Sequence, residues 1–251
     1  MISIIAQIGH FHLFMWDVVR FRRRQMPEWR LVLDQVYRIG NLSLPLVLIT
    51  SLSIGMVMAL QFGLSLERFG GTLYLPRVIT LSILKEMGPV FTGLILAARV
   101  GAGMASEIGS MVVTQQFDAF RALGSSPIKK VLLPRIIACL ICLPILVGIA
   151  NFVACFGGFL VGTSEMRLDP EFYVLKAISN LKPMDYLSWI GKSIAFSFFI
   201  SLPACYFGTY VENGTSGVGT ATRKAVVFSS ISILIGDFFI TKVFWLIEKF
   251  L

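Results

Sequence analysis

Charge is scarce in this sequence of 251 residues, and that shortage limits what the protein can be. Only 14% of the residues are charged, 56% are hydrophobic, and the mean hydropathy is +0.79. Soluble domains carry about 25% charged and about 45–50% apolar residues. The composition therefore excludes an ordinary soluble domain and places the chain in a lipid bilayer.

Histidine and cysteine are also rare, with two and four residues. Cys139 and Cys142 form a C-x-x-C pair inside an apolar run, without a histidine or second pair nearby, which argues against a metal or redox site. The triplet at residues 191–193 resembles the end of a phosphate-binding loop, but Tyr186 stands where that loop needs its first glycine. We therefore expect no metal, no nucleotide site and no catalytic residue in this chain.

Long apolar runs dominate what is present. The runs between Arg38 and Glu67 and between Arg135 and Glu165 carry no charge, and each exceeds the roughly 20 residues that cross about 30 Å of hydrocarbon. Three further runs contain embedded charges. We predict an all-α integral membrane protein with one transmembrane domain over residues 41–251 and about five spans, at residues 42–65, 78–98, 136–162, 186–210 and 225–245.

The first 40 residues predict a different environment. An apolar stretch with scattered polar residues is followed by a basic run made of Arg20, Arg22, Arg23 and Arg24. With Trp16 and Trp29 at headgroup level and the arginines facing anionic lipid, we predict an N-terminal interfacial amphipathic helix within residues 1–40. A sixth short span is the alternative.

Basic residues outside the spans orient the chain. Residues 1–38 hold six arginines against three acidic residues, and residues 99–135 hold five basic against two acidic residues, so both should be cytoplasmic. Residues 163–185 hold three basic against four acidic residues and suit the opposite side. We predict a cytoplasmic N-terminus and an outer C-terminus. The net charge of +8 thus reflects topology, and no basic patch with interleaved aromatics indicates nucleic-acid binding.

Four charged residues lie well inside the predicted spans: Lys85, Glu86, Lys192 and Asp237. At 1.5 Å of rise per residue, each is about 9–12 Å from the outer end of its helix, so the four charges converge on one level of the membrane. Their formal sum is zero, as expected where buried charges pair or line a wet cavity. The group is either a salt-bridge network that locks helices or a polar patch that meets a charged group of a substrate.

Small residues recur every fourth position at Gly93, Ala97, Gly101, Ala105 and Gly109. This spacing lets helix backbones approach closely in lipid. Packing within the chain and a dimer seam explain it equally well.

A polar stripe follows at steps of three and four residues, formed by Glu107, Ser110, Thr114, Asp118 and Arg121. Apolar residues occupy the other faces, which predicts one amphipathic helix between two spans, ended by Gly124. On the cytoplasmic side such a helix either lies on the lipid or docks a soluble partner.

Several motifs now resemble the MlaE/YrbE family of ABC-transporter permeases. They are KEMGPVFTGLILAARVGAGMASEIGSM from Lys85, ALGSSPIKKVLLPR ending at Arg135, GKSIAF in the fourth span, and GVGTATRKAVVFSS before the last span. In order, they cover nearly the whole chain. The resemblance implies a permease subunit of the bacterial inner membrane that pairs with a second copy and with a cytoplasmic ATPase, which binds the ATP. It also implies exchange of phospholipid with an outer-side MCE-domain protein.

The resemblance also implies roles for residues. The coupling helix that seats in the ATPase would carry Glu107, Thr114, Asp118 and Arg121, and Lys85, Glu86 and Lys192, joined by Asp237, would meet lipid headgroups at the outer mouth of a cavity. On this basis we expect Met56, Leu60 and Leu64 to line the part of the cavity that holds acyl chains. The family often has Arg where this chain has Lys85, and Lys lacks the planar fork for bidentate phosphate binding.

An ion-coupled secondary transporter or channel that uses Glu86 and Asp237 is the main alternative. It predicts transport driven by a gradient without an ATPase, together with inverted repeats, which the hydropathy pattern does not show. A membrane enzyme is less compatible with the sequence, because no intramembrane Ser/His pair or H-E-x-x-H motif occurs.

Overall fold

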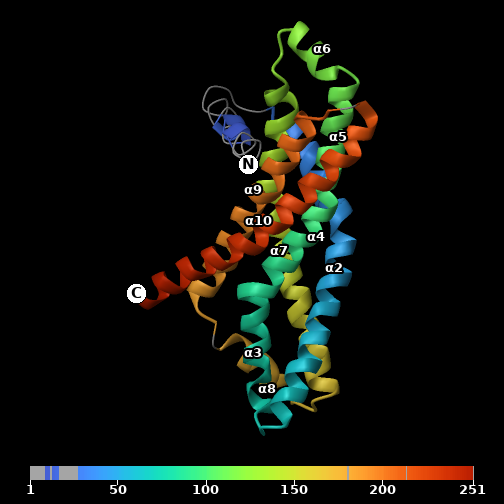
Figure 1. Ribbon diagram of the computed structural model, residues 1–251. Helices are drawn as coiled ribbons and strands as arrows, with labels where there is room; N and C mark the ends of the chain where they lie inside the picture. Colours follow the sequence, from blue (N-terminus) through green and yellow to red (C-terminus); the bar gives the residue numbers. More distant parts are fainter. Residues whose placement is uncertain (1–8, 12, 17–27, 180, 213, 251) are drawn as a thin grey trace. The chain divides into compact units, whose positions relative to one another are not determined.

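The computed structural model describes residues 9–11, 13–16, 28–179, 181–212 and 214–250, and this part of the chain contains helices but no strand. Five helical stretches are long and apolar enough to cross a membrane: Trp29–Glu67, Thr72–Val113, Ile128–Ser164, Pro183–Thr209 and Gly214–Phe250. The prediction of an all-α membrane protein with five transmembrane helices is therefore confirmed (Figure 1).

The helices extend beyond most of the predicted span limits, because hydropathy marks only the part that matches hydrocarbon while helical hydrogen bonding continues past it. The elements in chain order are α2 (Trp29–Glu67), η1 (Thr72–Tyr74), α3 (Leu75–Ser82), η2 (Ile83–Met87), α4 (Gly88–Leu96), η3 (Ala97–Gly101), α5 (Ala102–Val113), α6 (Gln116–Ala122), η4 (Ile128–Leu132), α7 (Leu133–Ser164), α8 (Pro170–Ile178), α9 (Pro183–Thr209) and α10 (Gly214–Phe250). The predicted boundary after residue 40 lies inside α2.

The chain forms two compact units. The first comprises Met1–Leu42, Leu96–Cys142 and Ser197–Ser232, and the second comprises Ser43–Ile95, Leu143–Phe196 and Ile233–Leu251. The long helices α2, α7, α9 and α10 thus contribute residues to both units.

The core of the first unit includes Phe14 from the short helical segment near the N-terminus. The rings of Phe11 and Phe14 contact the ring of Tyr206 on α9, with centroids 5.2 and 5.7 Å apart. The described part of the predicted interfacial region therefore packs an aromatic face on α9, while Trp16 is exposed. The predicted lipid-facing arginines Arg20, Arg22, Arg23 and Arg24 lie outside the described residues.

The core of the second unit depends on close helix contacts. Its buried cluster contains residues of α2, α3, η2, α7 and α8, and α3 lies beside α8 (Figure 1). A Cβ atom at Gly55 would stand 1.9 Å from the carbonyl oxygen of Ala154. Here α2 and α7 meet backbone to backbone, as small residues allow between membrane helices.

The ladder of small residues packs against side chains of its own chain. A Cβ atom added at three of its positions would lie within 3.4 Å of a neighbouring side chain, in the pairs Gly93 with Phe196, Gly101 with Ile200 and Gly109 with Val211. Ala97 and Ala105 are fully buried. Packing within the chain therefore accounts for this stripe, and these contacts leave no space for a second copy at the three glycines.

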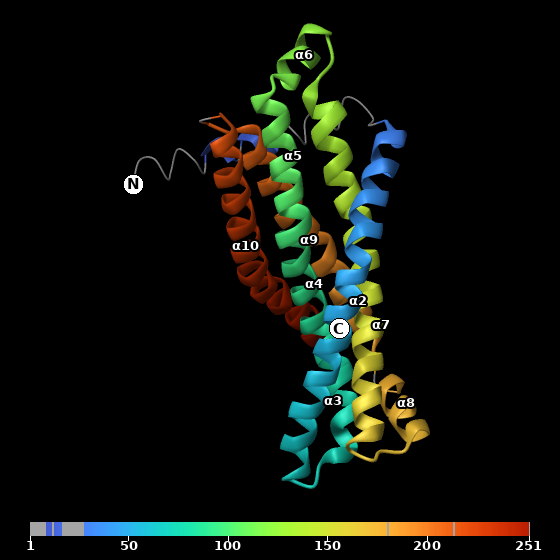
Figure 2. The same ribbon diagram turned by 90° about the vertical axis from the view of Figure 1, so that its right-hand side faces the viewer.

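The prediction of one continuous coupling helix from Glu107 to Leu123 is wrong. The helix α5 ends at Val113, Gln115 adopts a left-handed φ of 58°, and α6 begins at Gln116. The hydroxyl of Thr114 donates to the Ser110 carbonyl at 2.8 Å. Such side-chain bonds to the backbone compete with a continuing helix. Figure 2 shows α6 turning away from the end of α5.

The predicted stop at Gly124 is confirmed. Gly124 has a φ of 71°, its N–H donates to the Arg121 carbonyl at 3.0 Å, and the Ser125 N–H donates to the Phe120 carbonyl at 2.9 Å. These two bonds form a Schellman motif, for which glycine is preferred because it adopts a positive φ without strain.

We expect Gly55→Ala to destabilise the protein, because the new methyl group would occupy the position of the Ala154 carbonyl oxygen. Overpacking costs about 1–3 kcal/mol and occasionally more. Thermal unfolding in detergent, followed by intrinsic fluorescence, should show a lower midpoint. Gly219→Ala is the matched control, since its Cβ would meet nothing within 4 Å and alanine favours a helix. Equal losses in both variants would contradict the close α2–α7 contact.

Candidate functional site

The sequence around residue 85 interrupts regular helical hydrogen bonding. Residues Ile83–Met87 form a π-helical turn, and the Gly88 N–H donates to the Ile83 carbonyl. Pro89 follows directly and has no N–H to donate to the carbonyl of Lys85, four residues earlier. That carbonyl instead accepts a hydrogen bond from Nζ of Lys192 at 2.7 Å. Single π-helical turns occur frequently at functional sites.

Gly88 allows this turn to approach α7. A Cβ atom at Gly88 would lie 1.6 Å from Oδ1 of Asn151, so a side chain there would displace the Asn151 side chain of α7. Pro89 therefore leaves the Lys85 carbonyl open to the Lys192 ammonium, and Gly88 allows the close contact between the turn and Asn151.

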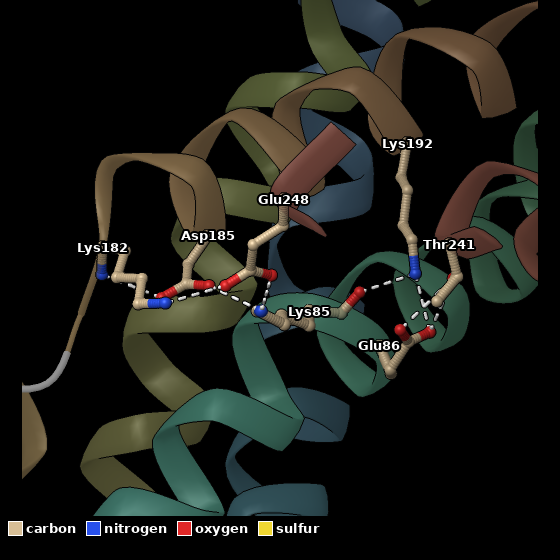
Figure 3. A network of polar contacts seen from close by, with 7 residues as sticks. All are labelled: Lys85, Glu86, Lys182, Asp185, Lys192, Thr241 and Glu248. Atoms are coloured by element: carbon tan, nitrogen blue, oxygen red, sulfur yellow. Dashed lines mark hydrogen bonds and ion pairs between the residues drawn. The ribbon is translucent and has the colours of Figure 1, made fainter. Parts of the chain in front are cut away.

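Lys192 is the centre of a buried ionic cluster, and its side chain is 0% exposed. Its Nζ atom lies 2.6 Å from Oε2 of Glu86 and 2.8 Å from Oδ1 of Asp237. The ammonium donates hydrogen bonds to Glu86 and to the Lys85 carbonyl, while its contact with Asp237 is an ion pair without hydrogen-bond geometry. Glu86 also accepts from the hydroxyl of Thr241 at 3.3 Å (Figure 3).

A second set of ion pairs continues the cluster. Nζ of Lys85 lies 2.8 Å from Oδ1 of Asp185 and 3.4 Å from Oε2 of Glu248. Lys182 pairs with the other oxygen of Glu248 at 3.0 Å, and its backbone N–H donates to Asp185 at 2.9 Å. Figure 3 shows both sets side by side, with Lys85 and Glu86 on the same π-helical turn. We call the eight residues Lys85, Glu86, Lys182, Asp185, Lys192, Asp237, Thr241 and Glu248 the polar network.

The polar network contains three lysines and four carboxylates, a formal excess of one negative charge. Its best-exposed cation is Lys182, at 66%, whereas Lys192 has no exposed surface. The structure therefore brings the four predicted residues Lys85, Glu86, Lys192 and Asp237 together, but it gives the Lys192 ammonium no surface for contact with a headgroup. That ammonium is already enclosed by two carboxylates and a backbone carbonyl of the chain.

Four members of the network were missed by sequence reasoning. Lys182 and Asp185 lie just before the predicted fourth span, Glu248 lies beyond the predicted end of the fifth, and Thr241 is uncharged. The signal that could have found the carboxylates Asp185 and Glu248 is the charge of Lys85 itself, because a lysine inside a span needs partners, and its side chain can reach those near the membrane boundary.

The three residues predicted to line a lipid cavity do not share one environment. Leu60 and Leu64 are 39% and 56% exposed, whereas Met56 packs against the core of the second unit. Met56 therefore differs from Leu60 and Leu64, since the exposed side chain next to it is Val57, and the lining of a lipid cavity by these three residues stays a prediction.

The predicted coupling residues also separate. Glu107 lies on α5 and accepts from the buried Arg135 at 2.9 Å, so it takes part in an ion pair within the first unit. Thr114 ends α5, while Asp118 and Arg121 form an exposed pair on α6 at 2.9 Å. Of the four residues, only Asp118 and Arg121 therefore share one helix on the surface.

A further ion pair in the first unit connects the start of α2 with η4. Lys130 donates to Glu28, and this hydrogen bond lowers the pKa of the Glu28 carboxyl below its usual range. Both side chains are partly exposed, so salt will screen the pair.

Comparison with known proteins gives a consistent result. Residues 32–243 match the family described as Permease MlaE. A probable ABC transporter permease protein of Rickettsia felis is 39% identical over 97% of this chain and 94% of its own length. The intermembrane phospholipid transport system permease protein MlaE of Haemophilus influenzae is 31% identical over 96% of this chain and 93% of its own length. The chloroplastic protein TRIGALACTOSYLDIACYLGLYCEROL 1 of Arabidopsis thaliana is 34% identical over 87% of this chain and 62% of its own length.

We expect Lys192→Met to destabilise the protein strongly, because the carboxylates of Glu86 and Asp237 would lose their shared cation. Removing one partner of a buried ion pair costs about 3–5 kcal/mol. The midpoint of thermal unfolding in detergent measures this loss. Lys182→Met, at an exposed position, is the matched control and should lower the midpoint much less.

The triple variant Glu86→Gln/Lys192→Met/Asp237→Asn should recover much of the lost stability, because no unpaired buried charge remains. If it is as unstable as Lys192→Met alone, charge pairing is not what stabilises this cluster.

Proposed function

This chain belongs to the MlaE family of ABC-transporter permeases, and on that premise we propose that it moves phospholipid between its own membrane and an outer-side MCE-type lipid carrier. A separate cytoplasmic ATPase would supply the energy, and two copies of the chain would form the translocation pathway. The observation that carries the proposal is the similarity, over nearly the full length, to the Haemophilus influenzae permease whose name states phospholipid transport.

The surface of α2 supports a lipid pathway. In the second unit, large apolar side chains that are at least 39% exposed occur at Leu46, Ile49, Val57, Leu60 and Leu64, and the exposed Ser53 separates the first two from the last three. A mostly apolar stripe on a membrane helix has little need of water and suits acyl chains or a second helix. We propose that this stripe lines the cavity for acyl chains and that the second copy closes it.

The polar network would set the positions of the helices next to that cavity. Its contacts support a positioning role for Lys192 and Asp237, since the ammonium is enclosed and lies against two carboxylates and a backbone carbonyl. Contact with headgroups falls instead to Lys85 and Glu86, whose side chains are each 34% exposed. A zwitterionic headgroup would match this pair of opposite charges.

Energy transfer would pass through α6. We propose that α6, which carries the exposed Asp118 and Arg121, seats in the ATPase, and that the chain lies in a bacterial inner membrane with its N-terminus in the cytoplasm. The proposal gives this chain no ATP hydrolysis of its own.

The decisive test is lipid transfer from proteoliposomes that contain the permease and its ATPase to acceptor vesicles loaded with the MCE-type protein. We expect fluorescent phospholipid to move only with hydrolysable ATP. Transfer that follows an imposed ion gradient, with no ATPase present, would instead support the ion-coupled transporter.

We expect Arg121→Ala to uncouple hydrolysis from transfer, because α6 would lose an exposed charge at its contact with the ATPase. Losing an interfacial charge pair commonly costs about 1.5 kcal/mol or more, so the amount of lipid transferred per ATP hydrolysed should fall roughly tenfold. Arg77→Ala removes an exposed arginine from α3 and serves as the control. Unchanged coupling in Arg121→Ala and in Asp118→Ala would contradict the assignment of α6.

A further inference from the structure

The described part of the N-terminal segment forms one wall of an apolar cavity in the first unit. Phe11 and Met15 of this segment line the cavity together with residues of α7, α9 and α10. Its volume is about 540 Å³. Every described residue that lines it is apolar except Ser232. The cavity therefore offers a ligand many dispersion contacts and few hydrogen-bonding groups.

This cavity lies in the part of the chain that crosses the membrane. Leu133, Pro203 and Phe228 line it and lie within seven residues of the predicted span limits at residues 136, 210 and 225. By the charge distribution of the loops, this end of the spans is the cytoplasmic one. Ile141 on α7 and Ile231 on α10 follow directly after lining residues or precede them, and they are 37% and 51% exposed. The lining thus continues into apolar surface that faces lipid hydrocarbon.

The cavity also reaches the packed core of the first unit. Leu133 and Ile136 line it and are only 1% and 6% exposed, and Phe198 and Leu202 pack against the same core. From Leu133 to Leu140 the lining covers seven residues of α7, which is about 10 Å at 1.5 Å of rise per residue. The cavity therefore has the length of part of an acyl chain.

Volume and surroundings together select the occupant. An engineered apolar cavity of about 150 Å³ stays free of water and binds benzene. A cavity of about 540 Å³ has room for a longer hydrocarbon. An α-helix with its side chains is about 10–12 Å across, which is too wide for this volume over a length of about 10 Å. Lipid hydrocarbon is the apolar material that surrounds the spans, so it can enter the cavity without leaving the membrane.

We propose that this cavity holds one acyl chain of a phospholipid of the cytoplasmic leaflet, with the headgroup at the membrane boundary. The ring of Phe11 already contacts the ring of Phe228 on α10, with centroids 5.6 Å apart. Because both residues line the cavity, the acyl chain adds to the contacts that hold the N-terminal segment on α10.

The site does not rest on the proposed transport function. All its lining residues belong to the first unit, whereas the proposed pathway uses residues of α2 in the second unit. Binding of the acyl chain requires neither ATP nor transfer.

The test uses the full chain in detergent with phosphatidylglycerol whose acyl chain carries a photoactivatable group, at one equivalent per chain. After illumination, mass spectrometry of peptides locates the labelled residues. We expect label on the peptides that contain Leu140, Phe198 and Phe228, which line the cavity from three different helices.

Two variants that fill the cavity sharpen this test. Ile137→Trp and Ser232→Leu should each reduce the labelling about tenfold, because displacing two buried methylene groups is enough for that change in affinity. Ile141→Trp and Ser230→Leu are the matched controls, since they make the same exchanges on the same helices at positions outside the lining. The midpoint of thermal unfolding shows which variants are folded, and either cavity variant alone can decide the outcome.

Loss of label in the cavity variants, with normal labelling in both controls, would support the site. Full labelling in a folded cavity variant would overturn it, as would equal losses in the controls, which would indicate a general effect of bulk. Absence of label from the three peptides of the unmodified chain would overturn it as well. A photoactivatable free fatty acid identifies the source of the acyl chain. If the fatty acid labels the cavity and phosphatidylglycerol does not, the phospholipid assignment is wrong.

Discussion

The burial of the Lys192 ammonium is the constraint on which the second unit depends. Removing such an ion from water costs several kcal/mol even after the protein relaxes, so the position is tenable only where opposite charges and hydrogen-bond acceptors surround the ammonium. Carboxylates of η2 and α10 supply the charges, and Glu86 and the Lys85 carbonyl accept its hydrogen bonds. That carbonyl is available because Pro89 lacks an N–H. A single proline thus makes possible a contact that fixes α9 against a turn about 100 residues earlier in the chain.

The polar network of the second unit mainly pairs its charges with one another, across η2, α9 and α10. Its charges therefore serve chiefly to hold these helices together. Lys85 and Glu86 differ from Lys192 because each keeps 34% of its side-chain surface exposed, so they are the members of the four predicted charges that a headgroup could still reach.

Sequence reasoning succeeded where one physical rule acts alone. The five spans follow from apolar length, the stop at Gly124 follows from local turn chemistry, and the meeting of Lys85, Glu86, Lys192 and Asp237 follows from the rise per residue. It failed where two rules compete. The polar periodicity around Glu107 continues through Thr114, yet local hydrogen bonds and the left-handed Gln115 end the helix there. It also missed Asp185 and Glu248, because hydropathy sets span limits without regard to the reach of the Lys85 side chain.

The break at Gln115 has a mechanical consequence for α6. A left-handed conformation at a residue other than glycine costs about 1 kcal/mol or more and persists only where neighbouring contacts enforce it. Here the Gln115 N–H donates to the Val112 carbonyl at 3.0 Å, and the Gln115 carbonyl accepts from Asp118 and Ala119 at 3.2 and 3.1 Å. The Schellman motif fixes the other end. Because backbone bonds hold both ends of this seven-residue helix, the corner at Gln115 sets the direction of α6 relative to α5.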